Sequence, residues 1–182
     1  MKSKMTPEEY RKLAARTLNS HLDRERRQTM IRMGLLGEVG ELSDYLKKCM
    51  FHGHPFDHVH VVKEVGASSW YVAAHYSDSN RVLPCYWTPP ACDALKAARL
   101  LRDGSNIGHQ LVQRTTEDAL RKYVEAWHRG DDMLWGPLVW LSWVLGVDLQ
   151  EAARLNIEKL QKRYPEGFSE TASMARLDME TT

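Results

Sequence analysis

Two short acidic motifs in the sequence have the spacing of a divalent-metal site. Glu38 and Glu41 lie three residues apart in a segment that predicts a helix, so both side chains are expected on one helical face. Glu64 lies in the next predicted helix. A solvated glutamate pair beside a tight helix contact has the same spacing and is the alternative interpretation. If the two helices pack together, the three carboxylates can form a common metal site.

The second acidic motif supplies one carboxylate fewer than a full cage requires. An antiparallel helix with carboxylates at positions i and i+3 would face Glu38 and Glu41, but the residue three after Glu64 is Ala67. Magnesium prefers hard oxygen ligands in octahedral geometry, and two such ions would neutralise a triphosphate and activate water. The sequence therefore predicts an oxygen-ligand site with three of four carboxylates.

A group of polar residues near the C-terminus has the chemistry of a phosphate-binding face. Asn156, Lys159 and Arg163 fall on one face of a predicted helix. Lysine and arginine complement phosphate as a point charge and as a planar fork. A solvated basic face near a helix C-terminus, which the helix dipole favours, is the alternative interpretation. Lys48 is a further candidate for contact with phosphate.

Glycines recur through the first acidic helix, at Gly34, Gly37 and Gly40. Each costs up to about 1 kcal/mol relative to alanine inside a helix. Three of them in succession predict the close approach of a neighbouring helix or a ligand. The apolar residues of the same segment follow the periodicity of one buried stripe, Leu35, Val39, Leu42 and Leu46.

The elements that must position these side chains are all predicted helices. Thr6 and Glu9 form a capping-box pattern before the first helix, and Asp148 and Glu151 form another before the last. The expected helices cover about residues 7–18, 23–49, 59–76, 91–102, 117–129, 133–145 and 149–164. No segment has a persuasive strand alternation, so the predicted fold class is all-α, a helical bundle.

One domain is expected over residues 1–168. Prolines and glycines interrupt its pattern between about residues 77 and 131, which predicts an inserted helical segment there. Residues 169–182 are polar and are expected to form a loose tail.

Composition excludes several classes of protein. Of the 182 residues, 43% are hydrophobic and 27% charged, and the net charge of +1 gives no basic field for a nucleic-acid polymer. The three cysteines, Cys49, Cys85 and Cys92, have no CxxC spacing, which fits a reducing cytoplasm. The N-terminus has no apolar signal region. The most apolar run, residues 133–147, is too short to span a bilayer, so a cytoplasmic location without membrane contact is expected.

Four segments of this chain, in this order, resemble the MazG-like, all-α nucleoside triphosphate pyrophosphohydrolases. Residues 34–48, GLLGEVGELSDYLKK, are similar to the first motif of that family, and FHGHPFD at 51–57 is similar to the loop that follows it. KEVGASSWY at 63–71 resembles the second motif, with Ala67 where the family has aspartate. NIEKLQKRYPEGF at 156–168 resembles the closing helix. The resemblance covers residues 28–76 and 133–168, and the segment 77–131 departs from it.

The resemblance implies an activity and a set of site residues. The family cleaves nucleotides between the α- and β-phosphates with Mg²⁺, for which Mn²⁺ can substitute, and its members form dimers or tetramers. It implies metal-binding, catalytic carboxylates at Glu38, Glu41 and Glu64, with Ala67 at the fourth catalytic position. It places Asn156, Lys159 and Arg163 near the nucleotide phosphates, and Lys48 is a weaker candidate for the same role.

Ala67 leaves two explanations open. It is either an inactivating substitution introduced to trap a substrate complex or a natural change that leaves a nucleotide-binding protein without turnover. Asp78 and Asp132 offer carboxylates nearby in the sequence, but neither has the helical spacing of a replacement. The identity of the base and the sugar, and the choice between a triphosphate and an alarmone-like nucleotide, are not indicated by the sequence.

Two further segments have chemistry of their own. Imidazole suits zinc, so the histidines at 52, 54, 58 and 60 are an alternative metal site. The tryptophan-rich run at 134–143 predicts a buried helix and a homo-oligomer interface, of a dimer or tetramer. Three function classes therefore remain: a pyrophosphohydrolase, a nucleotide-binding protein without turnover, and a structural helical adaptor.

Overall fold

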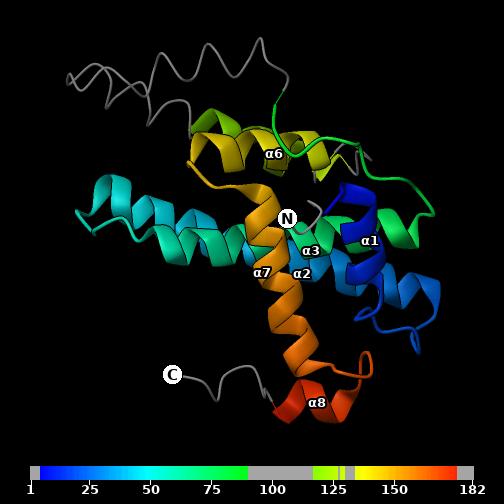
Figure 1. Cartoon of the computed structure of the whole chain (residues 1–182). Helices are drawn as coiled ribbons and strands as arrows, with labels where there is room; N and C mark the ends of the chain where they lie inside the picture. The colour runs from blue at the N-terminus through cyan, green and yellow to red at the C-terminus, as the bar shows by residue number, and fades with distance from the viewer. Residues whose placement is uncertain (1–4, 90–116, 127, 130–133, 176–182) are drawn as a thin grey trace.

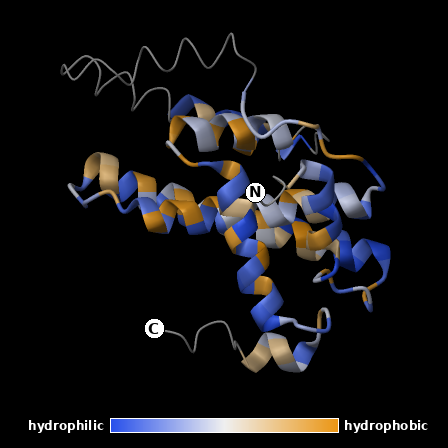
Figure 2. Cartoon of the chain, viewed as in Figure 1, coloured by the Kyte–Doolittle hydropathy of each residue, from blue (hydrophilic) through white to orange (hydrophobic). Residues whose placement is uncertain are grey.

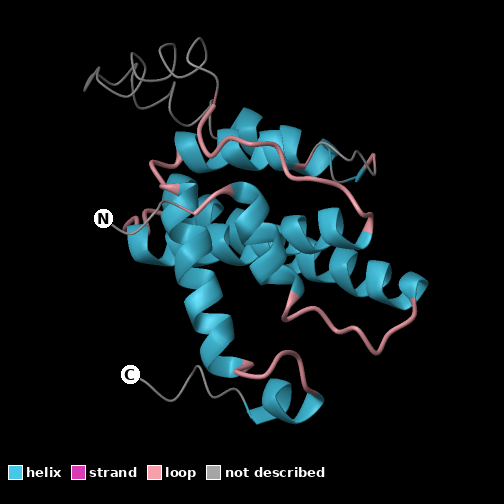
Figure 3. Ribbon diagram, turned by 45° about the vertical axis from the view of Figure 1, so that its right-hand side comes forward, coloured by secondary structure: helices cyan, strands magenta, loops and turns pink. Residues whose placement is uncertain are grey.

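The computed structural model describes residues 5–89, 117–126, 128–129 and 134–175. Every regular element within those residues is a helix, and no strand occurs among them (Figure 3). The all-α class is therefore confirmed. The helix expected at 91–102 and the candidate Asp132 lie outside the described residues. Of the helix expected at 117–129, residues 117–126 are helical.

The first helix, α1, covers Pro7–Ala15 and begins at the predicted capping box. The Thr6 hydroxyl accepts from the Glu9 amide at 3.2 Å, and the Glu9 carboxylate accepts from the Thr6 amide at 2.7 Å. The helix was expected to continue to Leu18 but ends three residues earlier. The amides of residues 16 to 18 there bond to carbonyls three residues back, at 3.1–3.3 Å, which tightens the chain into turns.

The two acidic segments form the long helices α2, Arg24–Phe51, and α3, His58–Asp78. An aspartate begins each of them: the Asp23 carboxylate accepts from the Arg26 amide, and Asp57 accepts from the amides at 59 and 60. The loop between the helices is short, and they pack side by side (Figure 1).

Contacts at both ends show that α2 and α3 are antiparallel. Arg27, near the start of α2, pairs with Asp78 at the end of α3, with Nε 2.5 Å from Oδ1. Tyr45, near the end of α2, accepts a hydrogen bond from the Asp57 amide just before α3. The predicted apolar stripe of α2 faces this contact and is buried, at Leu35, Val39, Leu42 and Leu46. The predicted antiparallel packing is therefore confirmed.

Helix α7, Leu149–Arg163, crosses α3 and extends past the α2–α3 pair (Figure 1). Hydrophilic and hydrophobic residues alternate along it, because one face packs on α3 and the other is exposed (Figure 2). At the crossing, Gly66 of α3 lies against the α7 backbone. A Cβ placed on Gly66 would be 2.7 Å from the Ala152 carbonyl oxygen. This glycine therefore sets the distance between the helix that carries Glu64 and the helix that carries the basic residues.

Replacing Gly66 with alanine is expected to destabilise the protein by roughly 1–3 kcal/mol, as overpacking of a close contact does. The backbone of α7 would have to move away from α3, because a carbonyl oxygen cannot rotate out of the way as a flexible side chain can. Thermal unfolding followed by circular dichroism would measure the loss. The control is Gly37→Ala on α2, where no heavy atom lies within 4 Å of the added Cβ. Equal melting temperatures for the Gly66→Ala and Gly37→Ala proteins would contradict this packing argument.

The tryptophan-rich segment forms α6, Trp135–Val144, which packs on α3 and α7. Trp135 is completely buried, whereas Trp140 and Trp143 are half-buried and stack on each other at 5.6 Å between ring centroids. The segment is therefore largely core, as predicted. Within the part of the chain that the structure describes, no helix is both long and apolar enough to cross a membrane.

Part of the C-terminal segment that was expected to be a loose tail is helical, and residues 176–182 lie outside the described part of the chain. Residues 170–175 form a short helix, α8, Glu170–Ala175, below the end of α7 (Figure 1). The Ser169 hydroxyl accepts from the Ala172 amide at 3.1 Å, which starts this turn. The polar composition of the segment concealed a capped helix, because a helix of this length has too few residues to show a periodicity.

Candidate functional site

The three predicted carboxylates meet between α2 and α3. Glu38, Glu41 and Glu64 each offer a carboxylate oxygen, and these oxygens lie within 4.8 Å of one another. Among the described residues, this is the only such group of three or more acidic, histidine or cysteine side chains. Glu38 and Glu64 are half-buried, and Glu41 is exposed. The antiparallel packing brings the two motifs together.

Crowding of these carboxylates changes the acidity of Glu38. Burial, followed by the negative charges of Glu64 and Glu41, raises the pKa of Glu38 to about 7. A hydrogen bond with Glu64 also favours the protonated form, whereas the positive charge of Lys159 opposes the rise in pKa. Ionisation of all three carboxyl groups near neutral pH is therefore unfavourable. A bound cation would reduce the repulsion between their negative charges.

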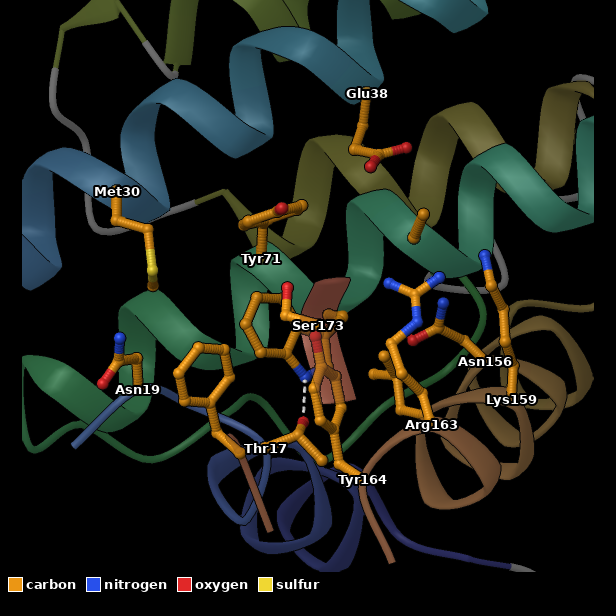
Figure 4. A pocket seen from close by; sticks show the side chains of 14 residues that line it. Thr17, Asn19, Met30, Glu38, Tyr71, Asn156, Lys159, Arg163, Tyr164 and Ser173 are labelled. Carbon is orange, nitrogen blue, oxygen red and sulfur yellow. Dashed lines mark hydrogen bonds between the residues drawn. The ribbon is translucent and has the colours of Figure 1, made fainter. Parts of the chain in front are cut away.

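A cavity of about 280 Å³ adjoins this cluster. Glu38 lies on one side of it, and Asn156, Lys159 and Arg163 of α7 lie on the other (Figure 4). Ala67 also lines the cavity. The cavity therefore has an acidic side and a basic side. The remaining lining is largely aromatic and apolar, with Met30, Trp70, Tyr71, Leu160, Tyr164 and Phe168.

The basic wall has one exposed and one partly buried cation. Lys159 is exposed, and Arg163 is half-buried with its guanidinium carbon 5.9 Å from the centre of the Tyr164 ring. Contact with an aromatic ring helps to orient a guanidinium. The prediction that these side chains share one face of the last helix is confirmed by their position on the cavity.

Asn156 differs from its neighbours because it is buried, with 8% of its surface exposed. Its amide oxygen has no hydrogen-bond partner in the structure. A buried acceptor without a partner costs about 1–3 kcal/mol. Because Asn156 lines the cavity, this oxygen is available as an acceptor or ligand atom to a group bound there.

Lys48 is not brought to this cavity. Its ammonium group pairs with Asp44 one turn earlier on α2, at 2.7 Å, and Lys48 is absent from the cavity lining. Together with Lys47 it lowers the pKa of Asp44 to about 2. The structure thus accounts for Lys48 as a partner of Asp44.

The glycine prediction holds at one of three positions on α2. A Cβ on Gly34 would be 2.0 Å from the Tyr71 ring, so the glycine makes room for this cavity-lining aromatic residue. Gly37 and Gly40 have no heavy atom within 4 Å of an added Cβ, so no part of the described structure approaches them closely. Trp70, also on the cavity, donates from its indole nitrogen to the Thr17 hydroxyl at 2.9 Å, which ties α3 to the segment after α1.

The alternative metal sites are not assembled. The histidines at 52, 54, 58 and 60 form no three-ligand group among the described residues. His58 contacts the Gly146 carbonyl at 3.2 Å, and the His60 ring lies against Tyr45, tilted by 45° with 4.3 Å between ring centroids. Asp78 forms a buried ion pair with Arg27 and is not part of the carboxylate cluster.

Several residues that border the carboxylate cluster or line the cavity were not identified from the sequence. His60 lies one helical turn before Glu64, with Nε2 3.7 Å from the Glu64 carboxylate; its i, i+4 spacing was a readable signal. Thr17, Asn19, Tyr164, Phe168 and Ser173 also line the cavity. They come from loops and from α8, where no periodicity indicates which way a side chain points.

The donor set fits a hard divalent cation. It consists of carboxylate oxygens from two antiparallel helices and of the Asn156 amide oxygen, which has no hydrogen-bond partner. The pKa of one of these carboxyl groups, Glu38, is raised. Comparison of this chain with protein-family models, curated proteins and solved structures found no match. The family likeness therefore depends on the sequence motifs, and the function on the chemistry of this site.

Proposed function

We propose that this chain is a MazG-like nucleotide pyrophosphohydrolase that uses Mg²⁺ or Mn²⁺, with activity reduced by Ala67. The observation that carries the proposal is one cavity lined by Glu38 of the three-carboxylate cluster and by the cations Lys159 and Arg163. A nucleoside triphosphate with a divalent ion presents the complementary charges. The aromatic lining offers a surface on which a base can stack.

In the proposed reaction, water adds across the anhydride bond between the α- and β-phosphates. The oxygen of water bonds to phosphorus on one side, and the bridging oxygen departs with the other fragment, giving a nucleoside monophosphate and pyrophosphate. The divalent ion, when bound, would supply charge neutralisation and Lewis acidity.

Each wall of the cavity has a distinct task in this proposal. Glu38, Glu41 and Glu64 would hold the ion as ionised carboxylates, and Glu38 is the one of the three that lines the cavity. Lys159 and Arg163 would hold the departing phosphates, since charge-assisted hydrogen bonds to phosphate oxygens are among the strong ones.

A nucleotide panel tests the proposal. The unaltered protein is expected to bind at least one nucleoside triphosphate in the presence of Mg²⁺ and to release pyrophosphate and monophosphate slowly. Calorimetry measures the binding, and chromatography of both products measures the turnover. Omission of Mg²⁺ is the control and should abolish turnover. Release of inorganic phosphate in place of pyrophosphate would overturn the proposed cleavage position.

The main alternative is a nucleotide-binding protein without turnover, and the observation that favours it is Ala67 itself. Mg²⁺-dependent binding with no products, even at high enzyme concentration, would select this alternative. Absence of any Mg²⁺-dependent nucleotide binding would leave a structural helical role. Self-association, for which the half-buried Trp140 and Trp143 are candidate contacts, is a separate proposal that light scattering can test.

A further inference from the structure

We propose that the amide oxygen of Asn156 is a metal ligand, in place of the carboxylate that Ala67 lacks. The inference rests on the metal site of the proposed function and adds a ligand from a third helix. It would explain how a site with three carboxylates retains a bound ion.

The position of Asn156 supports this assignment. Its Cβ is 3.3 Å from the point that a Cβ on Gly66 would occupy, next to Ala67 in the chain. Asn156, Ala67 and Glu38 line the same cavity. The close crossing of α3 and α7 at Gly66 thus brings the Asn156 side chain to the part of the site where an aspartate at 67 would begin.

The Asn156 amide oxygen, which has no hydrogen-bond partner, can bind only certain kinds of group. The Asn156 oxygen is an acceptor, so it needs a hydrogen-bond donor or a cation. The oxygens of an ionised phosphate are acceptors and cannot satisfy it. Neither Lys159 nor Arg163 donates to this atom, although both lie on the same cavity. A divalent cation held by the neighbouring carboxylates satisfies it, and amide oxygens are ordinary ligands of hard cations.

An Asn156 amide ligand in place of an aspartate at position 67 leaves the site with less negative charge. The amide oxygen supplies a ligand atom but no charge, so the negative charge comes from three carboxylates. Metal affinity should therefore depend strongly on Asn156 in this chain and much less once a carboxylate is restored at 67. This dependence makes the inference testable by a double-mutant cycle.

The experiment measures Mn²⁺ affinity without nucleotide, by electron paramagnetic resonance of the free ion. Asn156→Ala is expected to weaken Mn²⁺ binding about tenfold or more, the order of loss when one supporting group is removed from a metal site. Asn156→Asp is expected to tighten binding, which a misfolded protein would not do. In an Ala67→Asp background, Asn156→Ala should weaken binding less than about threefold.

Asn19 provides a matched control. It is also a buried amide on this cavity, but its oxygen already accepts from the His21 amide at 3.0 Å. Asn19→Ala should leave Mn²⁺ affinity unchanged. Unchanged affinity in Asn156→Ala, or an equal loss in both backgrounds, would overturn this inference alone. Failure of the unaltered chain to bind Mn²⁺ at all would overturn the metal site of the proposed function as well.

Discussion

Replacing Ala67 with aspartate is expected to raise the rate of pyrophosphate release by roughly 10- to 1,000-fold, about 1.4–4 kcal/mol in activation free energy. Ala67 lies three residues after Glu64 on the same face of α3 and lines the cavity, so an added carboxylate has space to reach the site. It would contribute a charged oxygen ligand and orient the attacking water. The measurement is product chromatography under single-turnover conditions with saturating Mg²⁺.

Ala67→Asn is the matched control for this rate effect. Its side chain has the size of aspartate but no charge, so it should raise the rate by less than the aspartate does. Equal rates for the aspartate and asparagine variants would show that filling the space matters and charge does not. No turnover by Ala67→Asp on any nucleotide, despite a normal melting curve, would favour the nucleotide-binding alternative.

The sequence predicted the helices of this site well, for reasons that are local. Capping residues such as Thr6, Asp57 and Asp148 accept from amides within three residues of themselves, so the starts of α1, α3 and α7 are encoded locally. The spacing of Glu38, Glu41 and Glu64 predicted convergence, because helices joined by a short loop generally pack antiparallel.

The part of the site that could not be predicted depends on distant contacts. The aromatic lining at Tyr164 and Phe168 follows the end of α7, where loop geometry sets each direction. The role of Gly66 was hidden as well, since only the crossing angle of α3 and α7 brings it against Ala152. Lys48, a weaker candidate for phosphate contact, pairs with Asp44 one turn earlier and does not line the cavity, so its phosphate role stays a prediction.

The second large effect concerns pH. The pKa of Glu38 is about 7 in the folded protein, against an ordinary value of 4.5 that applies to the unfolded chain. Between these two values the folded protein keeps a proton that the unfolded chain has lost. The stability of the metal-free protein should therefore fall as pH rises from about 4.5 to about 7 and stay low above that. Mg²⁺, which requires ionised carboxylates, should stabilise the protein most above pH 7.

Glu38→Gln separates the effect of Glu38 ionisation on stability from the effect of Mg²⁺, because it removes the charge while keeping the size of the side chain. At pH 8 without metal, the variant should melt higher than the unaltered protein by roughly 2–8 °C. That range corresponds to about 1–2 kcal/mol after allowance for solvent screening of a partly exposed group. The same variant should lose most of the stabilisation that Mg²⁺ gives. One substitution is thus expected to raise stability without metal and to abolish the gain from metal.

The measurement is a series of melting curves from pH 4.5 to 8.5, each with and without Mg²⁺. Glu158→Gln is the control, because Glu158 is an exposed glutamate on α7 that pairs with Arg154 away from the carboxylate cluster. It should keep both the pH slope and the response to Mg²⁺. If Glu38→Gln also keeps the pH slope and the response to Mg²⁺, the three carboxylates do not form a metal site in solution. That result would contradict both the metal site and the proposed activity.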